Sequence, residues 1–425
     1  MPVYDAVLVS AGAGGGRIAH AIAASGRRVA LVVPSGSPGG EAAPHPAGPG
    51  LLLDPGPSGE AVFGPLLPFT PTHAVQVKGR THTTPASRIE FARMIPGRRH
   101  APAVAAWAAA RVRFEVARLV GGGSEQRSYR DWLVSRFGQP AYDGLFAAYV
   151  ARRFGPAEEV VCGLGRLHQE VEAAWSVPAQ GWGAVAARLG EGVERVETAV
   201  LRVARDRVET ADGAFEGRVF LDVAPAVVAE WIGGEVPAPV RDGAGRLRAR
   251  TRVQVALRGG DELPLMTHLL DGEAPWWRVL RPGLLPGGPA GLVFVEASLE
   301  PGDPLLSLDD AALPRAAAEA LAAVGLPGFT PAELPVRRLP DHDAVWRPTH
   351  HTRLRHWLLA LDELGLTPLG RLGLSARLDP GTETHLARAV LDEDGPGLRE
   401  LVRVLVEPPV LDAPGRTRLG PMFRR

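Results

Sequence analysis

The stretch that decides the fold is VYDAVLVSAGAGGGRIAHAIAASGRRVALVVPSGSPGG, residues 3–40. Its apolar run over residues 3–10 predicts a buried strand. The Ala- and Ile-rich period of residues 16–25 predicts a helix, and Gly26 fits the position just past its end. Residues 28–33 predict a second apolar strand. A strand, a glycine-rich turn, a helix and a strand in this order form the βαβ unit with which dinucleotide-binding folds open.

The glycine-rich turn meets only part of the dinucleotide-binding pattern. That pattern has one glycine for the tight turn, one for approach to the pyrophosphate and one for helix–strand packing. These places fall on Ser10, Gly12 and Gly15, so the first glycine is missing. The second strand should end in an acid that binds ribose hydroxyls, but Val33 and Pro34 stand there. The motif alone leaves two interpretations open, a dinucleotide site or a turn whose glycines serve packing.

Composition narrows the class of protein. With 425 residues, 45% of them apolar, the chain can form two or three domains, or one large fold with an insertion. The 47 basic and 47 acidic side chains balance, which gives no electrostatic support for nucleic-acid or acidic membrane partners. The only cysteine is Cys162, so no disulfide framework or cysteine metal site is expected. We find no signal-peptide pattern and no apolar run long enough to span a bilayer, and we expect a cytoplasmic protein.

The rest of the chain alternates between strand-rich and helix-rich parts. Residues 34–72 are dense in Pro and Gly and predict mostly loop, and residues 73–85 predict a hairpin. Residues 87–172 carry helical patterns, in which Ser128 fits a helix N-cap and Asp131 the capping-box position. Strands return after this helical run. The order predicts an α/β fold, in which a Rossmann-like domain built from discontinuous segments holds an inserted helical plus β-sheet substrate domain.

We place the boundaries of these parts as follows. The nucleotide-binding-like domain takes residues 1–75, 180–250 and 340–410, the substrate domain takes 76–179 and 251–339, and a tail takes 411–425.

Further stretches carry a resemblance to a known family. They are SGSPGGE (35–41), GLLLDPGPS (50–58), SYRDWLVSRFGQPAYDGLFAAYV (128–150), SVPAQGWGAVAARLGEGVERVETAVLRV (176–203), ETADGAFEGRVFLDVAPAVVAEWIGG (209–234), AVWRPTHHTRLRHW (344–357) and LGRLGLSARLDPGTETHLARAV (369–390). In this order they resemble the FAD-dependent amine oxidase superfamily, which includes protoporphyrinogen oxidases, phytoene-desaturase-like enzymes and UDP-galactopyranose mutase. The resemblance spans nearly the whole chain and implies FAD as the cofactor.

The resemblance also implies where FAD contacts would fall. Gly12 and Gly15 would lie under the pyrophosphate at a helix N-terminus, which favours anions. Asp54 and Gly56 match the segment near the isoalloxazine, and Val200 matches the valine whose backbone meets the adenine. The paired glycines that let the backbone approach the cofactor are Gly39 and Gly40, and the closing motif is matched by Gly370, Arg371 and Asp379.

The chain departs from the family pattern at cofactor contacts. Val33 replaces the ribose-binding acid and Ser10 the first glycine. Ser37 stands where an arginine is usual, and Glu41 where a cation is common. Each lost hydrogen bond leaves a polar group unpaired, at a cost of about 1–3 kcal/mol. Arg17 offers a compensating phosphate contact, although the arginine-rich composition favours an ordinary exposed side chain. We therefore expect FAD binding to be weak or absent.

No catalytic residue and no metal site is assigned. For His350, His351 and His356, a solvated helix start is favoured over a substrate-facing or metal-binding role. For Trp276 and Trp277, packing of a sheet is favoured over lining a pocket. The arginines of RLRARTRVQV, residues 246–255, fit either a stripe for an anionic substrate or the exposed face of a strand, and Lys78 fits a hairpin tip.

Two functions from different classes follow from the resemblance. The first is an FAD-dependent oxidoreductase that oxidises an unidentified hydrophobic or amine substrate. The alternative is a flavin-free, catalytically inactive relative that acts as a binding or partner subunit. An oligomer is compatible with both, and neither involves nucleic acid.

Overall fold

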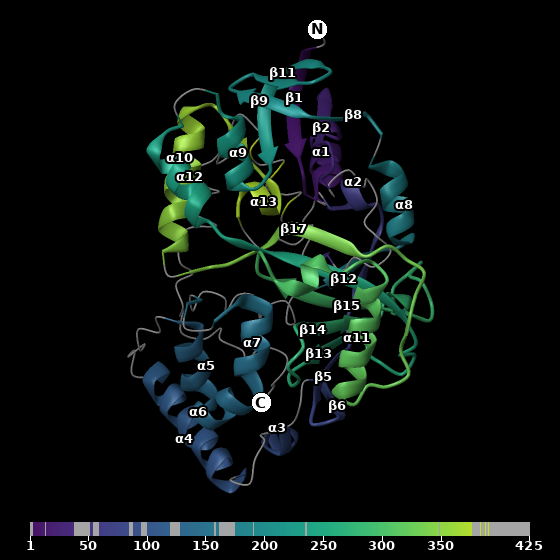
Figure 1. Cartoon of the computed structure of the whole chain (residues 1–425), viewed down its shortest axis with the longest axis vertical. Helices are drawn as coiled ribbons and strands as arrows, with labels where there is room; N and C mark the ends of the chain where they lie inside the picture. The colour runs from purple at the N-terminus through teal and green to yellow at the C-terminus, as the bar shows by residue number, and fades with distance from the viewer. Residues whose placement is uncertain are drawn as a thin grey trace.

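The computed structural model describes most of the chain. The described residues are 3–12, 14–37, 52–53, 59–84, 88–94, 100–119, 128–156, 159–160, 175–189, 191–233, 236–347 and 349–375, with Glu383, Ala387 and Val390. They form two large sheets and a separate group of helices, and the two sheets lie in different parts of the molecule (Figure 1).

The first sheet has seven strands in the order β8-β2-β1-β11-β10-β9, with β18 paired to β11. Its strands are β1 (Val3–Ser10), β2 (Val29–Pro34), β8 (Val193–Thr198), β9 (Val200–Ala204), β10 (Arg207–Thr210), β11 (Gly213–Asp222) and β18 (Thr367–Pro368). The run from β8 to β11, and β18 beyond it, is parallel, whereas β10 and β9 are antiparallel additions. The carboxyl ends of the parallel strands therefore meet at one edge, which is where open α/β sheets bind ligands.

The opening βαβ unit forms as the sequence predicts. Residues Ala6 to Val9 are fully buried, as expected of a parallel strand covered on both faces. Helix α1 (Gly15–Ala23) follows, and Gly26 ends the turn after it with a positive φ of 82°. Other helices beside this sheet are α2 (Gly59–Phe63), α8 (Gly181–Arg188), α9 (Pro225–Trp231), α10 (Ala238–Arg246), α12 (His350–Glu363) and α13 (Gly370–Gly373) (Figure 1).

The second sheet has eight strands in the order β16-β12-β15-β14-β13-β5-β6, with β17 paired to β12. Its strands are β5 (His73–Val77), β6 (Arg80–Thr84), β12 (Ala249–Arg258), β13 (Met266–Leu269), β14 (Trp276–Leu280), β15 (Leu292–Leu299), β16 (Thr330–Pro331) and β17 (Arg337–Ala344). Helix α11 (Ala312–Ala323) packs its apolar face, including Leu313 and Leu321, on this sheet. The predicted hairpin is confirmed, because Lys78 and Gly79 turn between β5 and β6 with φ of 51° and 69°.

The predicted helical run is confirmed where the structure describes it. It comprises α3 (Arg88–Met94), α4 (His100–Leu119), α5 (Tyr129–Phe137), α6 (Gln139–Ala141), the π-helix η2 (Tyr142–Phe146) and α7 (Ala147–Phe154). The capping box at α5 is present, with Asp131 N–H donating to Ser128 Oγ and Ser128 N–H donating to the Asp131 carboxylate. The stretch GLGRLHQEVEAAW lies almost wholly outside the described residues.

The loop expected over residues 34–72 is only partly correct. The structure places α2 there, and β4 (Leu66–Phe69), which pairs with β7 (Trp175–Pro178) beside β3 (Leu52–Leu53). Long-range pairing with β7 decides this strand, and the local Pro and Gly content gives no sign of it.

The predicted fold class is confirmed, since segments from both ends of the described chain share the first sheet while the second sheet and the helices lie between them in sequence. The exact domain boundaries stay a prediction.

Candidate functional site

The glycine-rich turn joins β1 to α1 at the carboxyl edge of the first sheet. Gly12 N–H donates to Ser10 Oγ at 3.2 Å, and Gly15 N–H donates to the Gly12 carbonyl at 3.2 Å. A methyl group on Gly15 would overlap the Ser10 hydroxyl, so the third glycine serves close packing. The serine in place of the first glycine is therefore part of the turn's own hydrogen bonding.

A carboxylate that sequence analysis missed lies against this turn. Asp222 ends β11, is 1% exposed, and accepts a hydrogen bond from Ser10 Oγ at 2.8 Å and from Leu372 N–H at 3.2 Å. A methyl group on Gly12 or on Gly370 would overlap its oxygens. Gly370 also has a positive φ of 67°, so both its backbone and its surroundings require glycine. The side chain of Asp222 thus fills the space that these two glycines leave open.

A second buried carboxylate, Glu383, lies over the start of α1. Its Oε1 and Oε2 atoms would be 3.2 and 2.9 Å from a Cβ on Gly14, the residue that precedes α1. Arg17 donates to Glu383 Oε2 at 2.9 Å, and Arg371 Nε lies 3.9 Å from Oε1. Arg17 is only 9% exposed, so the expected exposed arginine was wrong. Instead, Arg17 neutralises an acid brought in from far along the chain.

The two carboxylates influence each other. Burial, and then the negative charge of Glu383, raise the pKa of Asp222 to about 7. The hydrogen bonds from Ser10 and Leu372, and the charge of Arg17, act in the opposite direction. Asp222 is therefore a carboxyl group that changes charge near neutral pH.

The end of β2 carries no acid where the family pattern has the ribose-binding one. Val33 is fully buried within the hydrophobic core of the first sheet, and Pro34 pairs with Thr198 of β8. An acid at position 33 would therefore be introduced into an apolar environment, which is strongly unfavourable.

Of the other residues implied by the resemblance, the structure describes three and leaves the rest outside the described residues. Val200 is buried at the start of β9, and Gly370 and Arg371 open α13 beside Asp222 and Glu383. Positions outside the described residues are Gly39, Gly40, Glu41, Asp54, Gly56 and Asp379.

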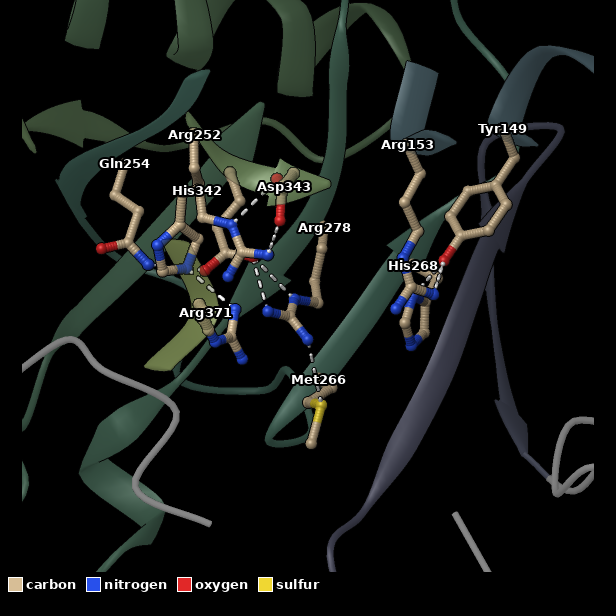
Figure 2. A network of polar contacts seen from close by, with 11 residues as sticks. Tyr149, Arg153, Arg252, Gln254, Met266, His268, Arg278, His342, Asp343 and Arg371 are labelled. Carbon is tan, nitrogen blue, oxygen red and sulfur yellow. Dashed lines mark hydrogen bonds and ion pairs between the residues drawn. The ribbon is translucent and has the colours of Figure 1, made fainter. Parts of the chain in front are cut away.

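A polar network extends from Arg371 of α13 into the second sheet (Figure 2). Arg371 donates to His342 Nε2 at 3.0 Å, and burial, with the nearby charges of Arg252 and Arg371, holds the pKa of His342 well below its usual range. Arg252 forms a two-bond ion pair with Asp343 at 3.2 and 2.5 Å. His342 is thus a neutral acceptor between two cations.

A second ion pair lies within the same sheet. Arg278 donates twice to Glu296 Oε2, at 3.0 and 2.5 Å, and Gln254 donates to Oε1 at 2.6 Å. Glu296 is fully buried, and although burial opposes it, Arg278 and Arg252 hold the pKa of Glu296 below its usual range. Arg250, 7% exposed, donates to the carbonyls of residues 151 and 152. The exposed-strand interpretation was therefore wrong for Arg250 and Arg252.

Tyr149, Arg153 and His268 form a separate group where α7 meets the sheet (Figure 2). Arg153 donates to the Tyr149 hydroxyl at 2.9 Å, and that hydroxyl lies 2.9 Å from His268 Nδ1. The Arg153 guanidinium also lies 4.6 Å from the Trp277 ring centroid. These contacts fix α7 on the sheet, and no sequence motif signalled them.

Three of the remaining candidates, Trp276, Trp277 and His350, are buried. Trp276 and Trp277 are buried in β14, as packing of a sheet requires. His350 is 2% exposed and its Nε2 lies 3.1 Å from the Ser375 carbonyl, so the solvated helix start was wrong for this residue. Burial, with the charge of His351, lowers the pKa of His350 to about 3. No group of three or more His, Cys, Asp and Glu side chains suited to a metal occurs within the described part of the chain.

The structure resembles several solved proteins. It matches reduced UDP-galactopyranose mutase over 98% of this chain and 97% of that chain, with a TM-score of 0.71 and 12% identity. It matches the cyclohexylamine oxidase of Brevibacterium oxydans over 92% and 99%, with a TM-score of 0.60 and 15% identity. It matches putrescine oxidase bound to putrescine over 92% and 98%, with a TM-score of 0.55 and 12% identity. No protein-family model and no curated protein matches the sequence.

These likenesses confirm the expected resemblance at the level of fold. The chain has the same fold as UDP-galactopyranose mutase and cyclohexylamine oxidase. Among the described residues, no helix combines the length and apolar character needed to cross a membrane.

The residues at the turn do not fit the pyrophosphate of FAD. The resemblance places that group over Gly12 and Gly15, and the Asp222 side chain lies against Gly12. Glu383 adds a second buried acid at the start of α1. A pyrophosphate brought to this place would meet the negative charge of Glu383, and that of Asp222 where it is ionised above about pH 7, in a buried setting, which is unfavourable.

Proposed function

We propose that this chain is a flavin-free member of its fold, which acts as a binding protein or as a partner subunit and carries out no redox chemistry of its own. The observation that carries the proposal is the Asp222 carboxylate, which occupies the face of Gly12 and binds Ser10 Oγ and Leu372 N–H. The second glycine of the motif exists to let the backbone approach a pyrophosphate. In this chain a protein side chain already makes that approach.

The end of β2, where the adenosine ribose of FAD would bind, supports the same conclusion. The acid that binds ribose in the family pattern is missing, and Val33 at its position belongs to the core of the first sheet. Polar ligand groups left without partners cost about 1–3 kcal/mol each. We therefore propose that the ligand is a protein partner or a small molecule other than FAD, and that it is not a nucleic acid.

A second candidate is an FAD-dependent oxidoreductase acting on a hydrophobic or amine substrate. It is favoured by the convergence of Arg17 and Arg371 on the turn, since guanidinium groups suit phosphates. For FAD to use them, Glu383 would have to leave both arginines.

The test is the flavin content and flavin affinity of the full-length protein. We expect protein purified from flavin-replete cells to show no flavin absorbance bands, and titration with FAD to leave flavin fluorescence unquenched. Stoichiometric flavin that survives dialysis would reject the proposal and establish the second candidate's cofactor. If no flavin is found, co-purification from the protein's own cells would identify the partner.

A further inference from the structure

We infer that Asp222 and Glu383 are internal substitutes for the two phosphates of a dinucleotide, so that removing their charges opens a latent dinucleotide-binding site at the start of α1. This inference rests on the proposed flavin-free function, and it assigns the cause of that function to two named side chains.

Asp222 makes the contacts of the first substitute. Its Oδ1 accepts from the backbone N–H of Leu372, and its Oδ2 from the hydroxyl of Ser10. Its oxygens also take the space over Gly12 and Gly370. A carboxylate that accepts from a backbone N–H and a hydroxyl beside a glycine turn makes the same kind of interactions as a phosphate oxygen. Asp222 therefore satisfies donors that an external anion would otherwise receive.

Glu383 makes the contacts of the second substitute. Helix α1 begins after Gly14 with no side-chain cap and no acidic residue in its first turn. The positive end of a helix favours an anion there, and Glu383 lies over Gly14 with only 2% exposure. Arg17 donates to it at 2.9 Å, and Arg371 approaches it to 3.9 Å. Glu383 thus lies beside a helix start and pairs with two cations.

Burial and distance in sequence show that the arrangement is built by the fold. Ser10 and Asp222 are 212 residues apart, and Arg17 and Glu383 are 366 residues apart. Buried carboxylates occur where partners offset the cost of desolvation. In this chain the offsetting partners are Ser10 Oγ and Leu372 N–H for Asp222, and Arg17 and Arg371 for Glu383.

The experiment compares the wild type with the double variant Asp222→Ala/Glu383→Ala, which removes both acids and the side-chain atoms that fill the space at Gly12 and Gly14. The ligand used is FAD, and its binding is measured by the quenching of flavin fluorescence. The control variant Glu209→Gln/Glu216→Gln removes two exposed acids around Arg207. We expect no detectable FAD binding by the wild type or the control. The double variant should bind FAD with an affinity at least roughly tenfold higher than the weakest that the titration detects. Adding Arg17→Met to the double variant should reduce that binding.

The outcomes separate the inference from the proposed function. Stoichiometric FAD in the wild type would overturn both. A folded double variant that binds FAD no better than the wild type would overturn the inference alone. If the double variant is unstable, its melting temperature with inorganic pyrophosphate gives the readout. A rise seen in the variant and not in the wild type supports the inference, and no rise contradicts it.

Discussion

At the scale of single residues, the pKa of Asp222 makes stability depend on pH. Its pKa is raised from 3.8 to about 7, mainly by burial and then by Glu383. Between these values the folded state holds a proton that the unfolded state has lost, so the free energy of unfolding falls as pH rises from about 4 to about 7 and is level above that range. The slope from this one group is on the order of 1 kcal/mol per pH unit.

The variant Asp222→Asn should lack this slope. Urea unfolding of both proteins between about pH 5 and pH 8.5 should show the stability of the wild type, relative to the variant, decreasing toward neutral pH. A difference that is constant with pH would show that Asp222 stays ionised in the folded state.

The buried pair of Arg17 and Glu383 gives a second prediction. Glu383→Gln removes the charge that faces Arg17, with both side chains largely buried at 11% and 2% exposure. Breaking a buried pair on one side costs about 3–5 kcal/mol, and the amide should retain part of this through a hydrogen bond. The control is Glu209→Gln, whose pair with Arg207 is about 40% exposed and should change stability by less than about 1 kcal/mol. Equal effects in denaturant unfolding would contradict the assignment.

At the scale of elements, the capping box of α5 should contribute measurably. Ser128→Ala removes the acceptor of Asp131 N–H at the start of this helix, at a cost of about 1 kcal/mol. Ser135→Ala in the interior of the same helix should be close to neutral, because alanine has the higher helix propensity. Thermal unfolding of both variants tests the difference, and a larger loss at Ser135 would contradict it.

The second sheet carries its own buried charge pair between β14 and β15. Arg278→Met should destabilise by about 3–5 kcal/mol, because Glu296 is fully buried and would lose its ion-pair partner. Replacing both residues with Met should recover much of the loss, since paired apolar residues tolerate such a site. Arg338→Met, which breaks a more exposed pair with Asp310, is the control. A double variant as unstable as the single one would show that Arg278 acts through other contacts.

At the scale of the whole molecule, the chain should be stable without FAD. A ligand at about 100 times its dissociation constant adds about 2.7 kcal/mol to the stability of the state that binds it. We therefore expect excess FAD to leave the melting temperature of the wild type unchanged. A rise of several degrees would show that FAD binds the folded protein and would contradict the flavin-free proposal.

The whole-molecule arrangement also connects the two sheets through side chains. Glu383 pairs with Arg371, and Arg371 donates to His342 of β17, which neighbours the Arg252–Asp343 pair (Figure 2). The carboxylate at the turn therefore contributes to how the first sheet is joined to the second.

The sequence by itself determined the local units of this protein. The unit from β1 to β2, the hairpin at Lys78 and Gly79 and the Ser128 capping box were all predictable, because each depends on residues a few positions apart. Turn chemistry, helix caps and hydrophobic period act over that range. The order of such units also carried the resemblance, and hence the fold class.

Only the tertiary structure decided what occupies the glycine-rich turn. Asp222 could have been noticed as an acid that ends the apolar run VFLD, but nothing in that run shows that it faces Gly12 and Ser10. Glu383 and Arg17 meet across 366 residues, and no local period records such a contact. The glycines of a motif fix the backbone shape, whereas the groups that fill the space they leave come from other strands and helices. The physical character of the site, an anion already bound, was therefore set by the packing of distant segments.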